Sequence, residues 1–285
     1  MYISAFTTPE SIIRQLEKTD TGSLPTEADS NYAALFVQLK EYCLEVSDWF
    51  SQRVWQTFVP YYEAKTFYLT ELIHDRRLRG YALTLPEALL EVDSITWLGT
   101  AVSSTYYHLL NGYRADRTPY TVIRFDPTGL SGIARDFDDA VVITGWWGYH
   151  SNYTQAFTAV ETVSISDSAT SLPVVSSAVY DTCQYLRIED EMLWITALAN
   201  STTLTVTRGV NGTTAAAHTT KAAQRYNVQP AVHHALSRFV AWAYDNRSNF
   251  GVLQFSDGSA VVQEMPKYVQ ETLSAFKTGD IIGVV

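Results

Sequence analysis

The sequence predicts an α+β fold in which a helical domain with β-strands is interrupted by an inserted all-β module. Apolar residues recur at helical spacing over residues 29–56, and the helical pattern returns from Pro230 onwards. Between them, residues 158–226 are dense in Ser, Thr, Ala and Val and contain short, regularly spaced strand-like runs. We therefore expect one discontinuous domain, residues 1–157 plus 227–285, with residues 158–226 as a separate β unit inside it.

Four segments have the features of helices. The first should begin at Pro9, capped by Thr7 or Thr8, because proline is favoured in a first helical turn. The third and fourth should begin at Pro230 and Pro266. The second, residues 29–56, carries an apolar stripe expected to face the core: Tyr32, Leu35, Phe36, Leu39, Cys43, Val46, Trp49, Phe50 and Val54.

Short strands are expected elsewhere in the larger domain, where aromatic and β-branched residues gather between turn signals. They lie between residues 58 and 125, and a buried strand at residues 140–144 should end in the turn of residues 145–149. Inside the module, strand-like runs occupy residues 163–165, 172–175, 185–188, 192–195 and 204–206.

The bulk composition limits the classes of function. A formal charge of −10 argues against a protein that grips nucleic acid, which needs a basic surface to displace counterions from phosphate. The two cysteines, Cys43 and Cys183, leave a disulfide open but unforced. The N-terminal residues lack the basic and apolar regions of a signal peptide, and the chain has no apolar run long enough to span a membrane. We expect a soluble protein made in the cytoplasm.

No residue pattern predicts an enzyme, a cofactor or a metal site. The histidines show no metal-binding spacing, and Ser131-Gly132 and Ser256-Asp257-Gly258-Ser259 lack the surroundings of a nucleophile. The acidic run at residues 136–139 is expected to be a surface turn. Glu189 and Glu191 are expected to face solvent at an exposed strand edge.

Several segments in a particular order resemble a known family. They are LPEALLEVDSITWLGT at residues 85–100, then Tyr106-Tyr107, then VVITGWWGY at residues 141–149. This order resembles the head–tail connector, or adaptor, proteins of tailed phages, so the larger domain would be a helical connector domain. In those relatives the next helix follows within a few residues, whereas here Pro230 comes after the inserted module.

The connector resemblance implies a function and a location. The chain would be a structural virion protein that forms a homo-oligomeric, dodecameric ring between the portal protein and a downstream neck or tail protein. The ring would extend the DNA channel, and DNA would pass through its lumen without sequence-specific binding. The protein would be made in the host cytoplasm, would end at the neck of the virion, and would contact no membrane.

The module carries a second resemblance, to a small β unit of phage neck and tail proteins. There, a strand with acidic residues precedes a strand that ends in arginine–glycine, a glycine–threonine turn and a histidine. The corresponding turn residues here are Arg208, Gly209, Gly212 and His218. The glycines supply turn dihedrals that larger residues avoid, and Arg208 and His218 are expected to hydrogen-bond the turn.

Two questions stay open from the sequence. The apolar C-terminal residues Ile281, Ile282, Val284 and Val285 either fold back on their own domain or form an arm that binds the portal, as the resemblance implies. The alternative function is a phage tail or surface-binding protein whose aromatic β module recognises carbohydrate. Exposed Trp and Tyr rings would favour that function, and Trp146, Trp147 and Trp194 are available, although all three lie in or beside strands, where we expect burial.

Overall fold

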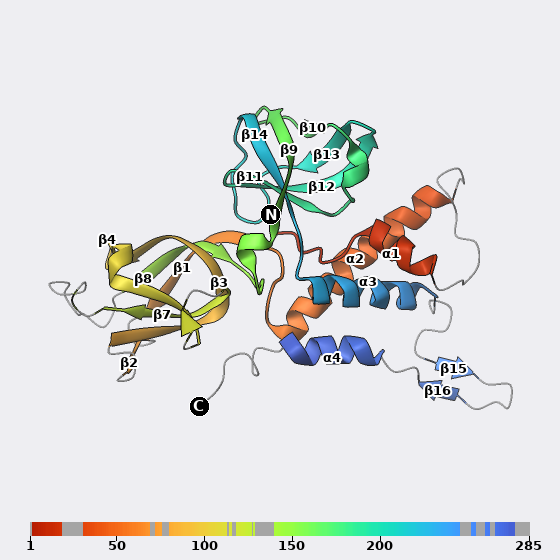
Figure 1. Cartoon of the computed structure of the whole chain (residues 1–285). Helices are drawn as coiled ribbons and strands as arrows, with labels where there is room; N and C mark the ends of the chain where they lie inside the picture. The colour runs from red at the N-terminus through yellow and green to blue at the C-terminus, as the bar shows by residue number, and fades with distance from the viewer. Residues whose placement is uncertain are drawn as a thin grey trace.

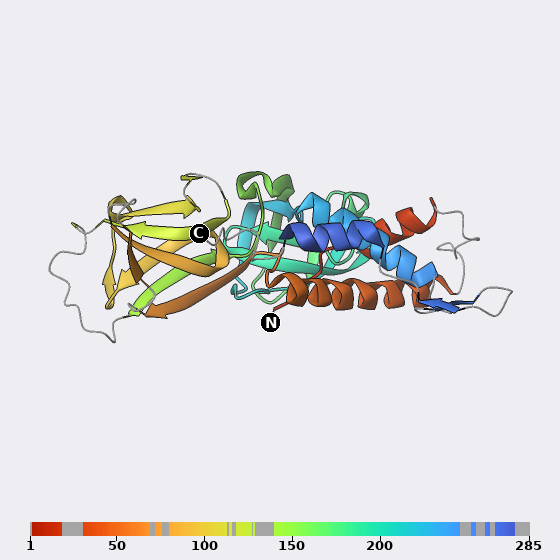
Figure 2. The ribbon, with the colours of Figure 1, turned by 90° about the horizontal axis from the view of Figure 1, so that it is seen from below.

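The computed structural model describes residues 2–18, 31–68, 72–75, 80–112, 114–115, 118–126, 128, 140–245, 252–254, 260–262 and 266–276. These residues form three lobes that meet near the N-terminus (Figure 1). One lobe is a curved sheet, one is a second sheet, and one is helical. Seen from below, the curved sheet and the helices lie at opposite ends of an elongated molecule (Figure 2).

The helical lobe contains α1 (Pro9–Leu16), α2 (Tyr32–Val54), α3 (Pro230–Asp245) and α4 (Lys267–Phe276). The expected starts at Pro9 and Pro230 are confirmed, and the Thr8 side chain caps α1 by accepting the Ser11 N–H. Five of the nine residues in the predicted apolar stripe of α2 are buried, namely Leu35, Leu39, Cys43, Phe50 and Val54. The other four are only partly buried, namely Tyr32, Phe36, Val46 and Trp49. Local signals therefore located the helices well.

The curved sheet has eight strands, all paired antiparallel and bent into a half-barrel (Figure 1). The strand order is β1-β8-β3-β7-β5-β6, with β2 and β4 also pairing with β3. Its core is its own, built around Leu83, Leu89, Ile123, Ile143 and Trp147. The strands are β1 (Tyr61–Tyr68), β2 (Leu72–Asp75), β3 (Gly80–Trp97), β4 (Thr100–Ala101), β5 (Tyr107–Asn111), β6 (Arg114–Ala115), β7 (Tyr120–Phe125) and β8 (Ala140–Trp147).

The second sheet has six strands in the order β10-β13-β12-β11-β14-β9 and also encloses its own core. Each of the five strand-like runs expected in the module overlaps one of its strands. The strands are β9 (Phe157–Ile165), β10 (Ser171–Pro173), β11 (Tyr185–Ile188), β12 (Glu191–Asn200), β13 (Thr203–Thr207) and β14 (His218–Tyr226). A separate hairpin joins β15 (Val252–Gln254) to β16 (Ala260–Val262).

The predicted fold class is wrong. The described residues are mostly β, and they do not form a helical connector domain interrupted by a β module. Strands β1 to β8 pair with one another around a separate core. The first and last of them are direct neighbours, from Tyr61↔Trp147 to Tyr68↔Ala140. The turn expected at residues 145–149 is also misplaced, since β8 continues through Trp147.

A central core joins the lobes. It contains Phe6 and Phe58, Trp146 from the curved sheet, Tyr185 from the six-stranded sheet, and Leu236 from α3, among other buried residues. The division into residues 158–226 and the remainder stays a prediction. Among the described helices, none is both long and apolar enough to cross a membrane.

Candidate functional site

The predicted turn residues lie in a loop, residues 208–218, that we call the latch loop. Arg208 follows β13 and forms a bidentate ion pair with Glu191 at the start of β12. Its Nε donates to Glu191 Oε1 and its Nη2 to Oε2, both at 2.6 Å. The Arg208 side chain is 6% exposed and that of Glu191 1%. A bidentate ion pair that is this well aligned and this deeply buried is among the strongest polar contacts in a protein.

His218, the first residue of β14, completes the cluster. Its Nε2 lies 2.8 Å from Glu191 Oε2 and its Nδ1 lies 2.9 Å from Glu189 Oε2. Arg208 also donates to the carbonyls of Ser166, Ala169 and Ala216. Arg208 therefore bonds the loop, at Ala216, and binds the Glu191 carboxylate as well. The His218 side chain, by contrast, contacts the Glu189 and Glu191 carboxylates rather than the turn itself.

The position of Glu191 corrects a sequence expectation. Glu191 is buried rather than solvent-facing, while the Glu189 side chain stays 45% exposed. Burial alone raises the pKa of Glu191, but the bonds from Arg208 and His218 and from the Ala216 N–H lower it below its ordinary value overall. Glu191 also accepts the Gly209 N–H at 3.1 Å. Because both oxygens are occupied, this carboxylate holds the loop and is poorly placed to act as a base.

The two latch-loop glycines have left-handed backbones, with φ of +58° at Gly209 and +82° at Gly212. Gly212 lies directly against the curved sheet, since a Cβ added there would come within 1.9 Å of the Tyr62 carbonyl oxygen. No larger residue fits this approach without moving the chain. The loop therefore joins the two sheets.

Asn211 is the residue of this loop that sequence reasoning missed. It is 2% exposed, accepts the Ile3 N–H on Oδ1 at 2.7 Å, and donates from Nδ2 to the Pro60 carbonyl at 3.2 Å. The Asn211 carbonyl accepts the Tyr62 N–H at 2.8 Å. The Asn211-Gly212 dipeptide, a strong turn signal, was the available sequence clue.

A cleft of about 520 Å³ adjoins the latch loop and has an acidic rim. Its charged groups pair with each other: Arg187 lies 3.5 Å from Glu91 and 3.7 Å from Asp190, and Tyr62 donates to Asp93. The Arg187 guanidinium also lies 4.7 Å from the centre of the Trp146 ring. These contacts connect the six-stranded sheet with the curved sheet, so the cleft is a region of contact between the two sheets.

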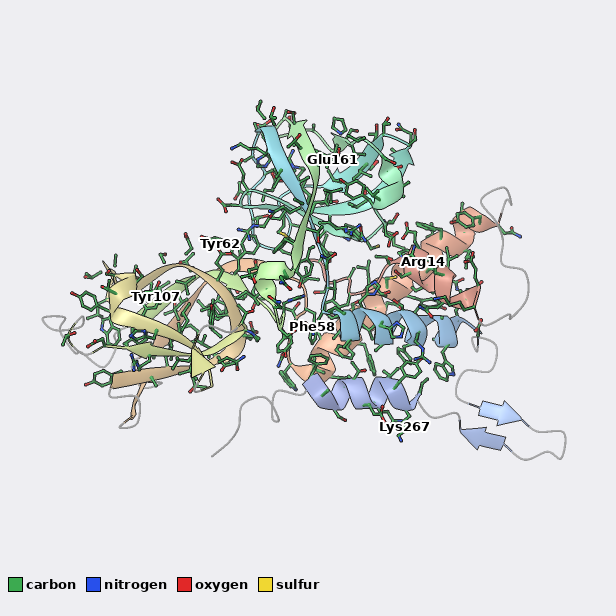
Figure 3. All side chains as sticks on the ribbon, viewed as in Figure 1. Arg14, Phe58, Tyr62, Tyr107, Glu161 and Lys267 are labelled. Atoms are coloured by element: carbon green, nitrogen blue, oxygen red, sulfur yellow. The ribbon has the colours of Figure 1, made fainter. Side chains whose placement is uncertain are left out.

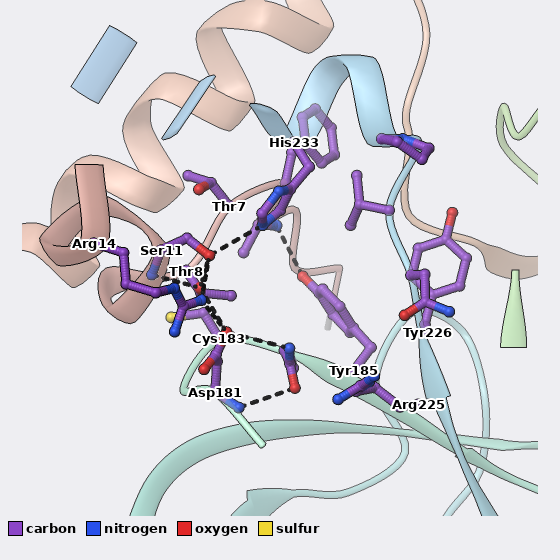
Figure 4. A pocket seen from close by; sticks show the side chains of 16 residues that line it. Thr7, Thr8, Ser11, Arg14, Asp181, Cys183, Tyr185, Arg225, Tyr226 and His233 are labelled. Carbon is purple, nitrogen blue, oxygen red and sulfur yellow. Dashed lines mark hydrogen bonds and ion pairs between the residues drawn. The ribbon is translucent and has the colours of Figure 1, made fainter. Parts of the chain in front are cut away.

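A second cavity, of about 340 Å³, lies where α1 and α3 meet the six-stranded sheet (Figure 4). It places Ser11 Oγ 3.3 Å from His233 Nε2, a spacing that invites comparison with a nucleophile and its base. However, Ser11 Oγ already accepts Arg14 Nη2 at 2.9 Å and Thr8 Oγ1 at 2.8 Å. The nearby Asp181 carboxylate bonds Arg14 and Thr8, and in the described part of the chain no carboxylate bonds His233.

The two cysteines do not indicate a reactive site either. Cys43 and Cys183 are both free and buried. Burial raises the pKa of Cys183 to about 12, so its thiol stays protonated at neutral pH. Over the residues that the structure describes, no group of three or more His, Cys, Asp or Glu side chains is arranged to hold a metal ion.

Side chains project outward from each of the three lobes (Figure 3), and the large apolar side chains that are exposed come from more than one lobe. Trp55 at the end of α2 is 79% exposed, and Val175 after β10 is 81% exposed. By contrast, the three tryptophans considered for carbohydrate recognition are buried: Trp146 is 3% exposed, Trp147 0% and Trp194 8%. The C-terminal residues Ile281, Ile282, Val284 and Val285, and the acidic run 136–139, lie outside the described residues.

Comparisons with models of known protein families, with curated proteins and with solved structures found no match to this chain. Geometry and sequence resemblance are therefore the grounds for a functional proposal.

Proposed function

We propose that the chain is a structural virion protein that forms a ring between the portal and the tail or neck of a tailed phage. The ring, dodecameric in the family that the sequence resembles, extends the DNA channel and joins head to tail at the neck of the virion. Its net charge of −10 suits a channel wall along which DNA slides without being held.

The segments that carry the resemblance support the proposal by their place in the fold. Residues 85–97 lie in β3 and residues 141–147 in β8, and these strands pair antiparallel from Leu89↔Trp147 to Trp97↔Val141. Segments separated by tens of residues thus form one structural unit. The pairing of β3 with β8 gives a physical reason why the two segments occur together, and in the order found in the family that the sequence resembles.

The observation that carries the proposal is Trp55. It is the C-cap of α2, with a left-handed φ of 57° and a side chain 79% exposed. A bulky residue in this backbone region is strained, and strain of this kind collects at functional sites. Tryptophan is also enriched among the residues that dominate binding energy at protein interfaces. We assign Trp55 to the contact between subunits.

A closed ring needs two different patches on each subunit, because each contact joins one face to another. Trp55 and Val175 lie on different lobes, the first on the helices and the second on the six-stranded sheet. The Val175 loop is held firmly, since Glu161 accepts both the Val175 N–H at 2.7 Å and the Tyr180 hydroxyl at 2.6 Å. A rigid loop that presents an apolar side chain loses little entropy on docking.

The test is the mass of the full chain, measured by mass photometry and imaged by negative-stain microscopy, alone and with the portal protein of the same phage. We expect rings from the wild-type chain and from Tyr106→Ser, an exposed control in the 3-10 turn that precedes β5. Trp55→Ser should keep its circular dichroism spectrum and lose the rings. A wild-type chain that stays monomeric with and without portal would overturn the proposal.

The C-terminal arm is a separate part of the proposal. Removing residues 278–285, which include Ile281, Ile282, Val284 and Val285, should abolish binding to the portal and leave the fold intact. Normal assembly of the shortened chain with portal would show that the arm is not the attachment. A misfolded product would favour the fold-back alternative.

A further inference from the structure

Helix α1 is fastened to the six-stranded sheet at the turn formed by Asp181 and Thr182. Arg14 Nη2 and Thr8 Oγ1 each lie 3.1 Å from Asp181 Oδ2. The Thr182 N–H donates to Glu10 Oε1 at 2.8 Å. We call this set of contacts the α1 joint. Figure 4 shows the arginine and aspartate of the joint at the edge of the cavity.

Glu10 is the unusual member of the α1 joint. Its Oε1 is bonded, but its Oε2 is buried and has no hydrogen-bond partner among the described residues. An ionised carboxylate is costly to bury when one oxygen lacks a donor, whereas the neutral acid is far cheaper. The geometry therefore favours a protonated Glu10 in the closed joint.

The charged and titratable groups around Glu10 also favour its neutral form. Asp181 adds a like charge, while Arg14 is bonded to Asp181 rather than to Glu10. Lys40 is bonded to the Thr196 carbonyl and lies over the Trp194 ring. The remaining neighbours are the buried Cys43 of α2 and Cys183, with His233 of α3 bonded to Ser11.

Burial, with a smaller contribution from Asp181, raises the pKa of Glu10 to about 7, against the lowering effect of hydrogen bonds from Thr182 and from the N–H of Glu10 itself. A carboxyl group that titrates near neutrality is half ionised there and fully ionised one or two pH units higher.

We infer that the α1 joint is a proton-operated switch: it is closed while Glu10 is neutral and loosens when Glu10 ionises beside Asp181. Loosening would weaken the attachment of α1 to the six-stranded sheet and open the adjoining cavity. The inference concerns the fold itself and does not depend on the proposed ring.

The sign and size of the effect follow from linkage. A group whose pKa is higher in the closed state stabilises that state at low pH, and the stabilisation is lost as the pH rises toward the closed-state value. With a pKa of about 7 closed and the ordinary 4.5 open, the opening constant should rise roughly thirtyfold between pH 5.5 and 8.5.

Hydrogen exchange of the full chain tests the switch, with protection factors corrected for the intrinsic pH dependence of exchange. Amides of residues 11–16 and 181–184 should lose roughly thirtyfold in protection between pH 5.5 and 8.5. Glu10→Gln, which keeps the acceptor of the Thr182 bond, should abolish this loss. Glu17→Gln, at the exposed end of the same helix, should behave as wild type.

Equal pH dependence in wild type and Glu10→Gln would overturn the inference. A second measurement covers a variant that fails to fold, namely the carbon-13 carboxyl titration of Glu10 in the wild-type chain. A midpoint near 7 supports the switch, and a midpoint at the ordinary value for glutamate refutes it.

Discussion

The guanidinium of Arg208 and the carboxylate of Glu191 form a bidentate ion pair with both N···O distances at 2.6 Å, inside a cluster that also holds His218. The pair connects the ends of β12 and β13 and fixes the start of the latch loop. Because the loop bonds Ile3, Pro60 and the Tyr62 backbone through Asn211, this ion pair also stabilises the contact between the two sheets.

Arg208→Ala should destabilise the chain by about 3–5 kcal/mol in urea unfolding, because it leaves the buried Glu191 carboxylate without its main counter-charge. The matched control is Lys221→Ala. Lys221 pairs with Glu189 in the same cluster, but both side chains are nearly half exposed, so the cost should stay below about 1 kcal/mol. Equal losses for the two variants would contradict the structural role assigned to Arg208.

The same cluster should make the chain sensitive to acid. The pKa of Glu191 is lower folded than unfolded, so its contribution is present above the ordinary glutamate value of 4.5 and is lost as the pH falls through the lower folded value. Arg208→Ala should flatten this part of the stability curve. A variant whose stability falls as steeply as wild type below pH 4.5 would assign the acid sensitivity to other groups.

Elements with strong local signals could be predicted from the sequence. Thr8 and Pro9 mark the start of α1, and the five strand-like runs of the module all overlap strands. Strand β14 was missed because much of it is polar and exposed, with His218, Ala223 and Tyr226 its buried positions. Its place depends on pairing with β9 and β11, which no local pattern reveals.

The prediction of the fold class was wrong for a related reason. Strand β3 runs through Pro86 with a register shift between Thr84 and Leu89, although proline ordinarily ends a strand. The partner of β1 is β8, far along the chain, so the sequence shows single strands but not the sheet they form. Likewise, the sequence predicted Glu191 to face solvent at a strand edge, because Arg208 and His218, which make its burial possible, come much later in the chain.

The apolar stripe of α2 gives a second test of the packing. Leu39 is 0% exposed within the cluster that joins α1, α2 and α3, so Leu39→Ala should cost about 2–5 kcal/mol in urea unfolding. Val37, two residues earlier, is 57% exposed, and Val37→Ala should stay within about 0.5 kcal/mol of wild type. An unchanged midpoint for Leu39→Ala would mean that α2 faces the other way.

The contact between Gly212 and Tyr62 provides the sharpest test of how the sheets are joined. Gly112→Ala is the matched control, since Gly112 also has a positive φ, of 57°, but nothing lies within 4 Å of an added Cβ. It should show only the backbone penalty of about 1–2 kcal/mol. Gly212→Ala adds a collision with the Tyr62 carbonyl oxygen, so its total cost should reach about 3 kcal/mol or more.

Hydrogen exchange distinguishes a local effect from a general one in these two variants. In Gly212→Ala the loop must move away from β1, which breaks the bond from the Tyr62 N–H to the Asn211 carbonyl. The Tyr62 amide should then exchange much faster, while amides within the six-stranded sheet, such as Leu193, keep their protection. Gly112→Ala should leave the Tyr62 amide as protected as in wild type. If Gly212→Ala did the same, the latch loop would not be what holds the two sheets together.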